Sequence, residues 1–97
     1  MVVRSDLPRG LQAANIVHAA GESSPGHLPS GTHAVCLVVP GEADLRVLER
    51  QLRDAGVPFA AVVENDAPYT DQLMAIGVAP SQKGDLKRHL SSLPLLR

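Results

Sequence analysis

The sequence predicts an α/β fold, specifically a three-layer α/β/α sandwich around a mixed four-stranded sheet. Short apolar runs of strand length alternate with longer stretches of helical periodicity, and turn-forming residues separate them. One pair of neighbouring strands is joined by a link too short to contain a helix, which suits a hairpin. The expected element order is β-α-β-α-β-β-α, and 97 residues are expected to make one domain spanning residues 1–97.

The first twenty residues are predicted to form a strand followed by a helix. Val2 and Val3 favour a strand, and Pro8 suits the first helical position because its φ is fixed and it has no N–H. Residues 11–20 are nearly all small or apolar, which is typical of a helix packed closely on a sheet. Gly21 is expected to end this helix, and a segment rich in turn formers follows it.

The middle of the chain is predicted to form a strand, a helix and a second strand. The run from His33 to Val39 is continuously apolar, so we expect a central strand covered on both faces. Residues 42–55 show apolar side chains at helical spacing with charges outside, and Gly56 is expected to end the helix. Phe59–Val63 is predicted to be a second buried strand.

The last third begins with a polar loop at residues 64–70, which is followed by a strand predicted over Gln72–Val78. A last helix is expected to begin at Pro80 and Ser81. Its apolar stripe is predicted to comprise Leu86, Leu90 and Leu93. The tail from Leu93 to Arg97 is apolar, so we expect it to pack back onto the sheet.

Composition and motifs argue against several classes of protein. The net charge is −1, whereas proteins that hold nucleic acid mainly through its phosphates usually carry a basic excess; a local basic patch is still compatible with this composition. No apolar run is long enough to span a membrane, and Asp6, Pro8 and Arg9 interrupt any signal-peptide pattern, so a cytoplasmic protein is expected. The histidines and Cys36 match no zinc spacing, and no phosphate-binding glycine motif is present, so we predict neither a metal nor a cofactor.

The predicted turn between the first strand and the first helix is one candidate site. It places Arg4, Asp6 and Arg9 near a helix N-terminus, where backbone N–H groups favour an anion. Asn15 and His18 lie three residues apart on the helix itself, so they share a face. They are either a core pair satisfied by backbone groups or an acid–base and substrate-orienting pair.

The loop after the third strand is a second candidate site. Glu64 and Asp66 supply two carboxylates and Thr70 supplies a hydroxyl, close to a strand end where α/β proteins commonly bind ligands. The alternative interpretation is an ordinary solvated loop.

Four segments together resemble the archaeal and eukaryotic type of peptidyl-tRNA hydrolase, also called type 2. They are Val2–Leu7, the helix segment Ala13–Ala20, Met74–Pro80 and the closing Leu93–Leu96. The sequence is even more similar to small uncharacterised bacterial relatives of that fold, over nearly the whole chain. The resemblance implies an α/β/α fold, hydrolysis of the ester between a peptide and the 3′ ribose of tRNA, tRNA as a partner, and a homodimer.

The resemblance also implies roles for individual residues. Asp6 matches the family's Asp after the first strand, His18 its helix histidine, and Thr70 its threonine before the last strand. Glu64 or Asp66 matches the family's acidic residue after the third strand. Asn15 stands where the family has glutamine. The family's Gly-Lys-Gly-Lys is replaced by Pro8-Arg-Gly-Leu11, and arginine stays protonated, so Arg9 would bind phosphate or an oxyanion and not act as a base.

Two functions therefore follow from the sequence. The first is a diverged peptidyl-tRNA hydrolase in which Asp66 or Glu64 activates water, His18 assists proton transfer, and Thr70 and Arg9 bind the substrate. The second is a non-enzymatic binding module of the same fold that holds a small ligand or a protein partner.

Overall fold

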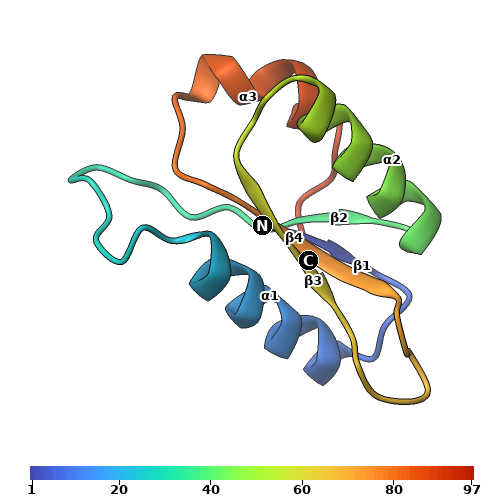
Figure 1. Cartoon of the computed structure of the whole chain (residues 1–97). Coiled ribbons are helices and arrows are strands. Elements are labelled where there is room, and N and C mark those ends of the chain that lie inside the picture. The colour runs from blue at the N-terminus through green and yellow to red at the C-terminus, as the bar shows by residue number, and fades with distance from the viewer.

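The computed structural model describes residues 1–97 and contains four strands and three helices (Figure 1). The strands are β1 (Val2–Arg4), β2 (Leu37–Val39), β3 (Phe59–Val63) and β4 (Leu73–Val78). The helices are α1 (Arg9–Ser23), α2 (Glu42–Asp54) and α3 (Lys83–Leu90). The predicted α/β class and the element order β-α-β-α-β-β-α are confirmed.

The four strands form one mixed sheet in the order β2-β1-β4-β3. β1 runs parallel to β2, with Val3 opposite Val38, and antiparallel to β4, with Val3 opposite Ala75. β3 and β4 form the predicted antiparallel hairpin, in which Ala61 lies opposite Ile76. β1 and β4 are therefore the central strands, and β2 and β3 are the edges.

Helices cover both faces of this sheet, so the molecule has three layers (Figure 1). Alternate residues along a strand point to opposite faces, and the two cores use this alternation: Val2 points to the α2 face and Val3 to the α1 face. The core on the α2 face comprises Val2, Val39, Leu45, Leu48, Leu52, Leu73 and Ile76. The core on the α1 face comprises Val3, Leu7, Ala19, Val62, Met74 and Ala75.

α1 packs closely against the sheet because both surfaces carry small residues. Ala19 is fully buried, and a Cβ added to Gly77 of β4 would collide with the carbonyl oxygen of Ala19 and come within 2.6 Å of the Ser23 hydroxyl oxygen. Gly77 thus permits the close approach of the helix backbone to the strand. No helix of this chain combines the length and the apolar character needed to cross a membrane.

The structure corrects two predictions about strands. The run 33–39 forms only the three-residue edge strand β2, and residues 33–35 lie outside the sheet and are exposed. β3 is likewise an edge strand, with Ala61 and Val63 exposed. Continuous apolar runs suggested central strands. Here Leu37 and Val39 of β2 pack against the core on the α2 face, Val38 packs against the core on the α1 face, and the C-terminal tail pairs with the outer backbone edge of β2.

Several helix boundaries also differ from those predicted. α1 begins one residue after Pro8 and continues through Gly21 to Ser23, and α3 begins at Lys83. Leu93 lies beyond the end of α3, although it still packs against the core with Leu90. The prediction that the tail packs back onto the sheet is confirmed, because the tail pairs with β2 through an antiparallel bridge between Leu37 and Leu95.

Candidate functional site

One edge of the sheet collects the segments that follow three strands. β4 is antiparallel to both β1 and β3, so β1, β2 and β3 all run the same way and end at the same edge. The turn into α1, the turn into α2 and the loop 64–72 therefore lie on the same side of the sheet, at the right of Figure 1. Ligands of α/β proteins commonly bind at this carboxyl edge, so we take it as the candidate site.

A buried arginine lies at the centre of the carboxyl edge. The Arg4 side chain, at the end of β1, is only 7% exposed. Its Nε and Nη2 donate to the two carboxylate oxygens of Asp6, each at 2.8 Å, and its Nη1 donates to Oε1 of Gln72 at 2.7 Å. The guanidinium carbon also lies 5.8 Å from the centre of the Tyr69 ring. Arg4 thus joins the turn after β1 to the loop before β4.

The Arg4–Asp6 pair fixes the charge of both groups. Hydrogen bonds from Arg4 lower the pKa of Asp6 below its ordinary value of 3.8, and burial opposes this only in part. The hydrogen bond to Asp6 correspondingly raises the pKa of Arg4. The Asp6 side chain is 45% exposed, so its carboxylate is a fixed negative charge that faces solvent at the start of α1.

A second polar contact joins α2 to the start of β4. Oε2 of Glu42, the first residue of α2, accepts a hydrogen bond from the Leu73 backbone N–H at 2.7 Å. Arg46 lies one turn further along the helix, and its Nη2 contacts the same Glu42 oxygen at 3.4 Å and the Asp71 carbonyl at 3.3 Å. The loop between β3 and β4 is therefore tied to α2 as well as to β1.

The predicted residues on α1 lie at different depths. Arg9 is the first residue of the helix and is exposed at the carboxyl edge. Because a helix rises about 1.5 Å per residue, Asn15 lies about 9 Å and His18 about 14 Å along the axis from it. Asn15 is buried and donates its side-chain amide to the Leu11 carbonyl at 2.9 Å, whereas His18 is exposed and lies 3.5 Å from Glu22. Asn15 and His18 therefore have different partners and do not form a pair.

The predicted residues of the β3–β4 loop all lie at the carboxyl edge. Oε1 of Glu64 accepts hydrogen bonds from the backbone N–H groups of Asn65 at 2.8 Å and Asp66 at 3.2 Å. Glu64 thereby fixes the start of the loop, while the side chains of Asp66 and Thr70 are exposed. Neither Asp66 nor Thr70 makes a side-chain hydrogen bond within the protein, so both are free to meet a ligand.

No family model and no curated protein matches this chain. The resemblance to type 2 peptidyl-tRNA hydrolases therefore stays a prediction. No group of three or more His, Cys, Asp or Glu side chains is arranged to hold a metal ion. The chemistry available at the carboxyl edge is that of carboxylates, a hydroxyl and guanidinium groups.

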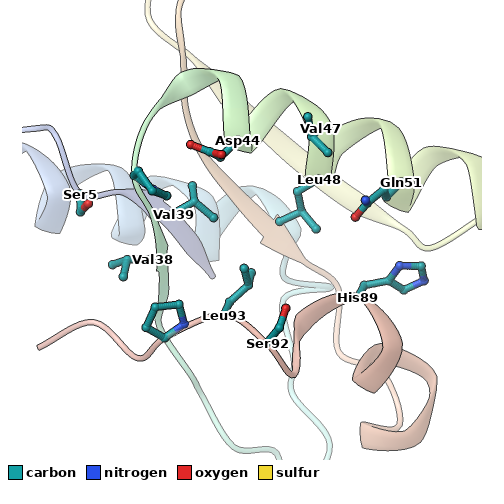
Figure 2. Close-up of a pocket in the computed structure, with 12 residues that line it drawn as sticks. Ser5, Val38, Val39, Asp44, Val47, Leu48, Gln51, His89, Ser92 and Leu93 are labelled. Atoms are coloured by element: carbon teal, nitrogen blue, oxygen red, sulfur yellow. The ribbon is translucent and has the colours of Figure 1, made fainter.

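A groove lies beside the carboxyl edge, between α2, β2 and the segment after α3 (Figure 2). It has a volume of about 490 Å³. Leu48 from α2, Val38 from β2 and Leu93 from the tail form apolar parts of its wall, and Asp44 and His89 supply polar groups from opposite sides. The segment at residues 89–94 is distant in the sequence from β2 and α2, which explains why the sequence did not reveal the groove.

The sequence placed Arg4 near a helix N-terminus. It did not reveal that Gln72 accepts a hydrogen bond from Arg4, or that Glu42 accepts one from the Leu73 backbone N–H. The available signal was the arginine itself, because a charged residue that follows two valines in a central strand needs a partner when it is buried. The identity of that partner was not available, since Gln72 lies 68 residues away in the chain.

Proposed function

We propose that this chain is an ester hydrolase of the type 2 peptidyl-tRNA hydrolase kind, with its active site at the carboxyl edge of the sheet. The observation that carries this proposal is the convergence of Asp6 and Arg9 after β1 with Glu64, Asp66 and Thr70 after β3. These five residues come from two segments more than fifty positions apart in the sequence. They include the carboxylates, hydroxyl and cation that hydrolysis of an ester on tRNA requires.

Each residue has a role that fits its surroundings. The Asp66 carboxylate, exposed and without a partner in the protein, accepts a proton from a water molecule. The resulting hydroxide attacks the ester carbonyl carbon, the bond from that carbon to the ribose 3′ oxygen breaks, and this oxygen takes up the proton that Asp66 accepted, which restores the Asp66 carboxylate. The Thr70 hydroxyl donates to the carbonyl oxygen, and Arg9 at the start of α1 contacts a phosphate.

Asp6 and Glu64 position other groups of the site. Asp6 has a lowered pKa and two hydrogen bonds from Arg4, so it stays ionised and positions Arg4, which in turn holds the loop through Gln72. Glu64 orients the backbone at Asp66. His18 and Asn15 stay predictions from the resemblance, and we assign them no step because they lie farther along α1.

The proposal is tested by incubating the protein with an N-blocked aminoacyl-tRNA and measuring the release of free tRNA. Asp66→Asn should lower the rate at least about 100-fold, because it removes the base but keeps the shape of the side chain. Its melting temperature should stay close to that of the wild type, because Asp66 is exposed. Asp54→Asn makes the same change at an exposed position at the end of α2 and should leave the rate unchanged.

His18→Ala in the same assay separates the two sites that the sequence suggested. Full activity of this variant agrees with a site confined to the carboxyl edge, and loss of activity would move the site along α1. Undiminished hydrolysis by Asp66→Asn would refute the assigned base.

A non-enzymatic binding module is the second candidate, and the groove beside α2 favours it. Its wall is apolar at Val38, Leu48 and Leu93 and polar at Asp44 and His89, as suits a small amphipathic ligand. Absence of hydrolysis at high protein concentration, together with tRNA binding that is weak or insensitive to salt, would support this function, because contact with several phosphates weakens steeply as salt rises.

A further inference from the structure

The loop that carries Asp66 and Thr70 contains a strained backbone position. Asp71 has a φ of 64°, in the left-handed region, and it is the only residue other than glycine that adopts a positive φ in this chain. Residues with a Cβ are uncommon in this region, although aspartate tolerates it better than most. Such a conformation persists only where neighbouring groups hold it, and positions of this kind cluster at functional sites. The groups that hold Asp71 therefore bear on the shape of the loop.

Two groups hold the backbone of Asp71. Its N–H donates to the Glu64 carbonyl at 2.8 Å, a bond within the loop 64–72. Its carbonyl accepts a hydrogen bond from Nη2 of Arg46 on α2 at 3.3 Å. Arg46 is the only side chain from outside the loop that hydrogen-bonds to the backbone of residues 65–71. It therefore supplies a contact that the loop cannot make for itself.

The guanidinium of Arg46 is itself held by two carboxylates of the same helix. Its Nη2 lies 3.4 Å from Oε2 of Glu42, one turn earlier, and its Nη1 lies 3.3 Å from Oε1 of Glu49, three residues later. Oε2 of Glu42 also accepts the Leu73 N–H at 2.7 Å, which fixes this turn of α2 against the start of β4. Arg46 is thus a donor whose position is set before any substrate arrives.

We infer that Arg46 is a positioning residue for the proposed hydrolysis. By holding the Asp71 carbonyl, it fixes the backbone directly after Thr70 and with it the loop that carries Asp66. This inference rests on the proposed function, in which the Thr70 hydroxyl donates to the ester carbonyl oxygen and Asp66 activates water. Arg46 contacts neither the substrate nor the water in this assignment and acts only through the shape of the loop. A misplacement of about 1 Å can lower a rate about 100-fold, because the reacting groups lose their alignment.

A positioning role and a purely structural role predict different results. A structural role would show as a loss of stability, but ion pairs this exposed contribute little, so removing Arg46 should change the Tm only slightly. A positioning role shows in the rate, because Asp66 and Thr70 shift relative to the ester. The phosphate contact assigned to Arg9 is untouched, since Arg9 lies on α1. The loss should therefore lower kcat and leave KM nearly unchanged, as expected for interactions made only in the transition state.

Steady-state hydrolysis of an N-blocked aminoacyl-tRNA, with kcat and KM measured separately, tests the inference. Arg46→Met removes every donor but keeps much of the length of the side chain. It should lower kcat at least about tenfold and change KM less than about twofold. Arg46→Lys keeps a cationic donor and should recover part of kcat. Arg50→Met is the matched control: it makes the same change one turn further along α2, at an exposed residue without an ion pair, and should leave both constants unchanged.

Hydrogen exchange at the Asp71 amide gives a second readout that does not depend on activity. In Arg46→Met this amide should exchange at least about tenfold faster, while the Ala75 amide in the central strand β4 stays protected as in the wild type. Faster exchange with an unchanged kcat would overturn the positioning role. A lower kcat with unchanged exchange would also overturn it, because Arg46 would then act on the substrate directly. Absence of hydrolysis by the wild type refutes the proposed function itself, whereas equal kcat values of an active wild type and Arg46→Met refute only this inference.

Discussion

Replacing Arg4 with methionine tests whether the buried guanidinium holds the carboxyl edge together. Methionine keeps much of the length and apolar volume of the side chain but removes every donor. The variant therefore loses both hydrogen bonds to Asp6, the hydrogen bond to Gln72 and the contact with the Tyr69 ring. The turn after β1 and the loop before β4 then lose the polar contacts that Arg4 makes between them.

The expected magnitude follows from burial. Removing one partner of a fully buried ion pair costs about 3–5 kcal/mol, because the other charge is left without compensation. Asp6 is 45% exposed and can be hydrated when Arg4 is absent, which places Arg4→Met at about 3 kcal/mol, the lower end. In a chain of 97 residues this corresponds to a fall in Tm of at least about 10 °C.

Urea unfolding of four proteins measures this effect: wild type, Arg4→Met, Asp6→Ala and the double variant. The double variant should be less destabilised than the sum of the single changes, with a coupling of about 1–3 kcal/mol between the two residues. Arg4→Lys is the control, since one ammonium cannot form the two parallel hydrogen bonds and should recover only part of the stability. A free energy of unfolding for Arg4→Met within about 0.5 kcal/mol of the wild type would refute the reasoning.

Two further predictions concern close packing and acid. Gly77→Ala should destabilise the protein by about 1–3 kcal/mol in urea unfolding, because the new Cβ collides with the Ala19 carbonyl oxygen. Gly84→Ala is its matched control, since nothing lies within 4 Å and the helix gains about 1 kcal/mol; equal effects would contradict the packing argument. In acid, the lowered pKa of Asp6 gives stability that is fully present above its ordinary value of 3.8 and lost as pH falls through the folded value. The free energy of unfolding, measured over a series of pH values, should show this loss. If this free energy depends on pH in Arg4→Met just as it does in the wild type, the ion pair with Arg4 is not the cause.

The periodic elements could be predicted because their signals are local. Leu45, Leu48 and Leu52 recur at helical spacing and form one buried face of α2. The apolar run of residues 73–78 forms the central strand β4, and the short link before it forms the predicted hairpin. The edge positions of β2 and β3 could not be predicted, because both strands place apolar side chains in or against the cores on both faces of the sheet, as central strands do.

The candidate site was predicted in part. The segments that supply Asp6, Arg9, Glu64, Asp66 and Thr70 were recognised from their positions after expected strands, and the direction of β3 brings them to one edge. His18 was grouped with Asn15 by its spacing on the helix, but three residues span enough rotation for one side chain to be buried and the other exposed.

By itself the sequence determined the class of the fold, the order of its elements and the segments that hold reactive side chains, because hydrophobic spacing and turn residues act over a few neighbouring positions. Only the tertiary structure decided that Arg4 meets Gln72, that the tail covers β2 and that β3 is an edge strand. Strand order brings these distant segments together, and local spacing does not determine strand order. The contacts between such segments therefore could be identified only in the folded chain.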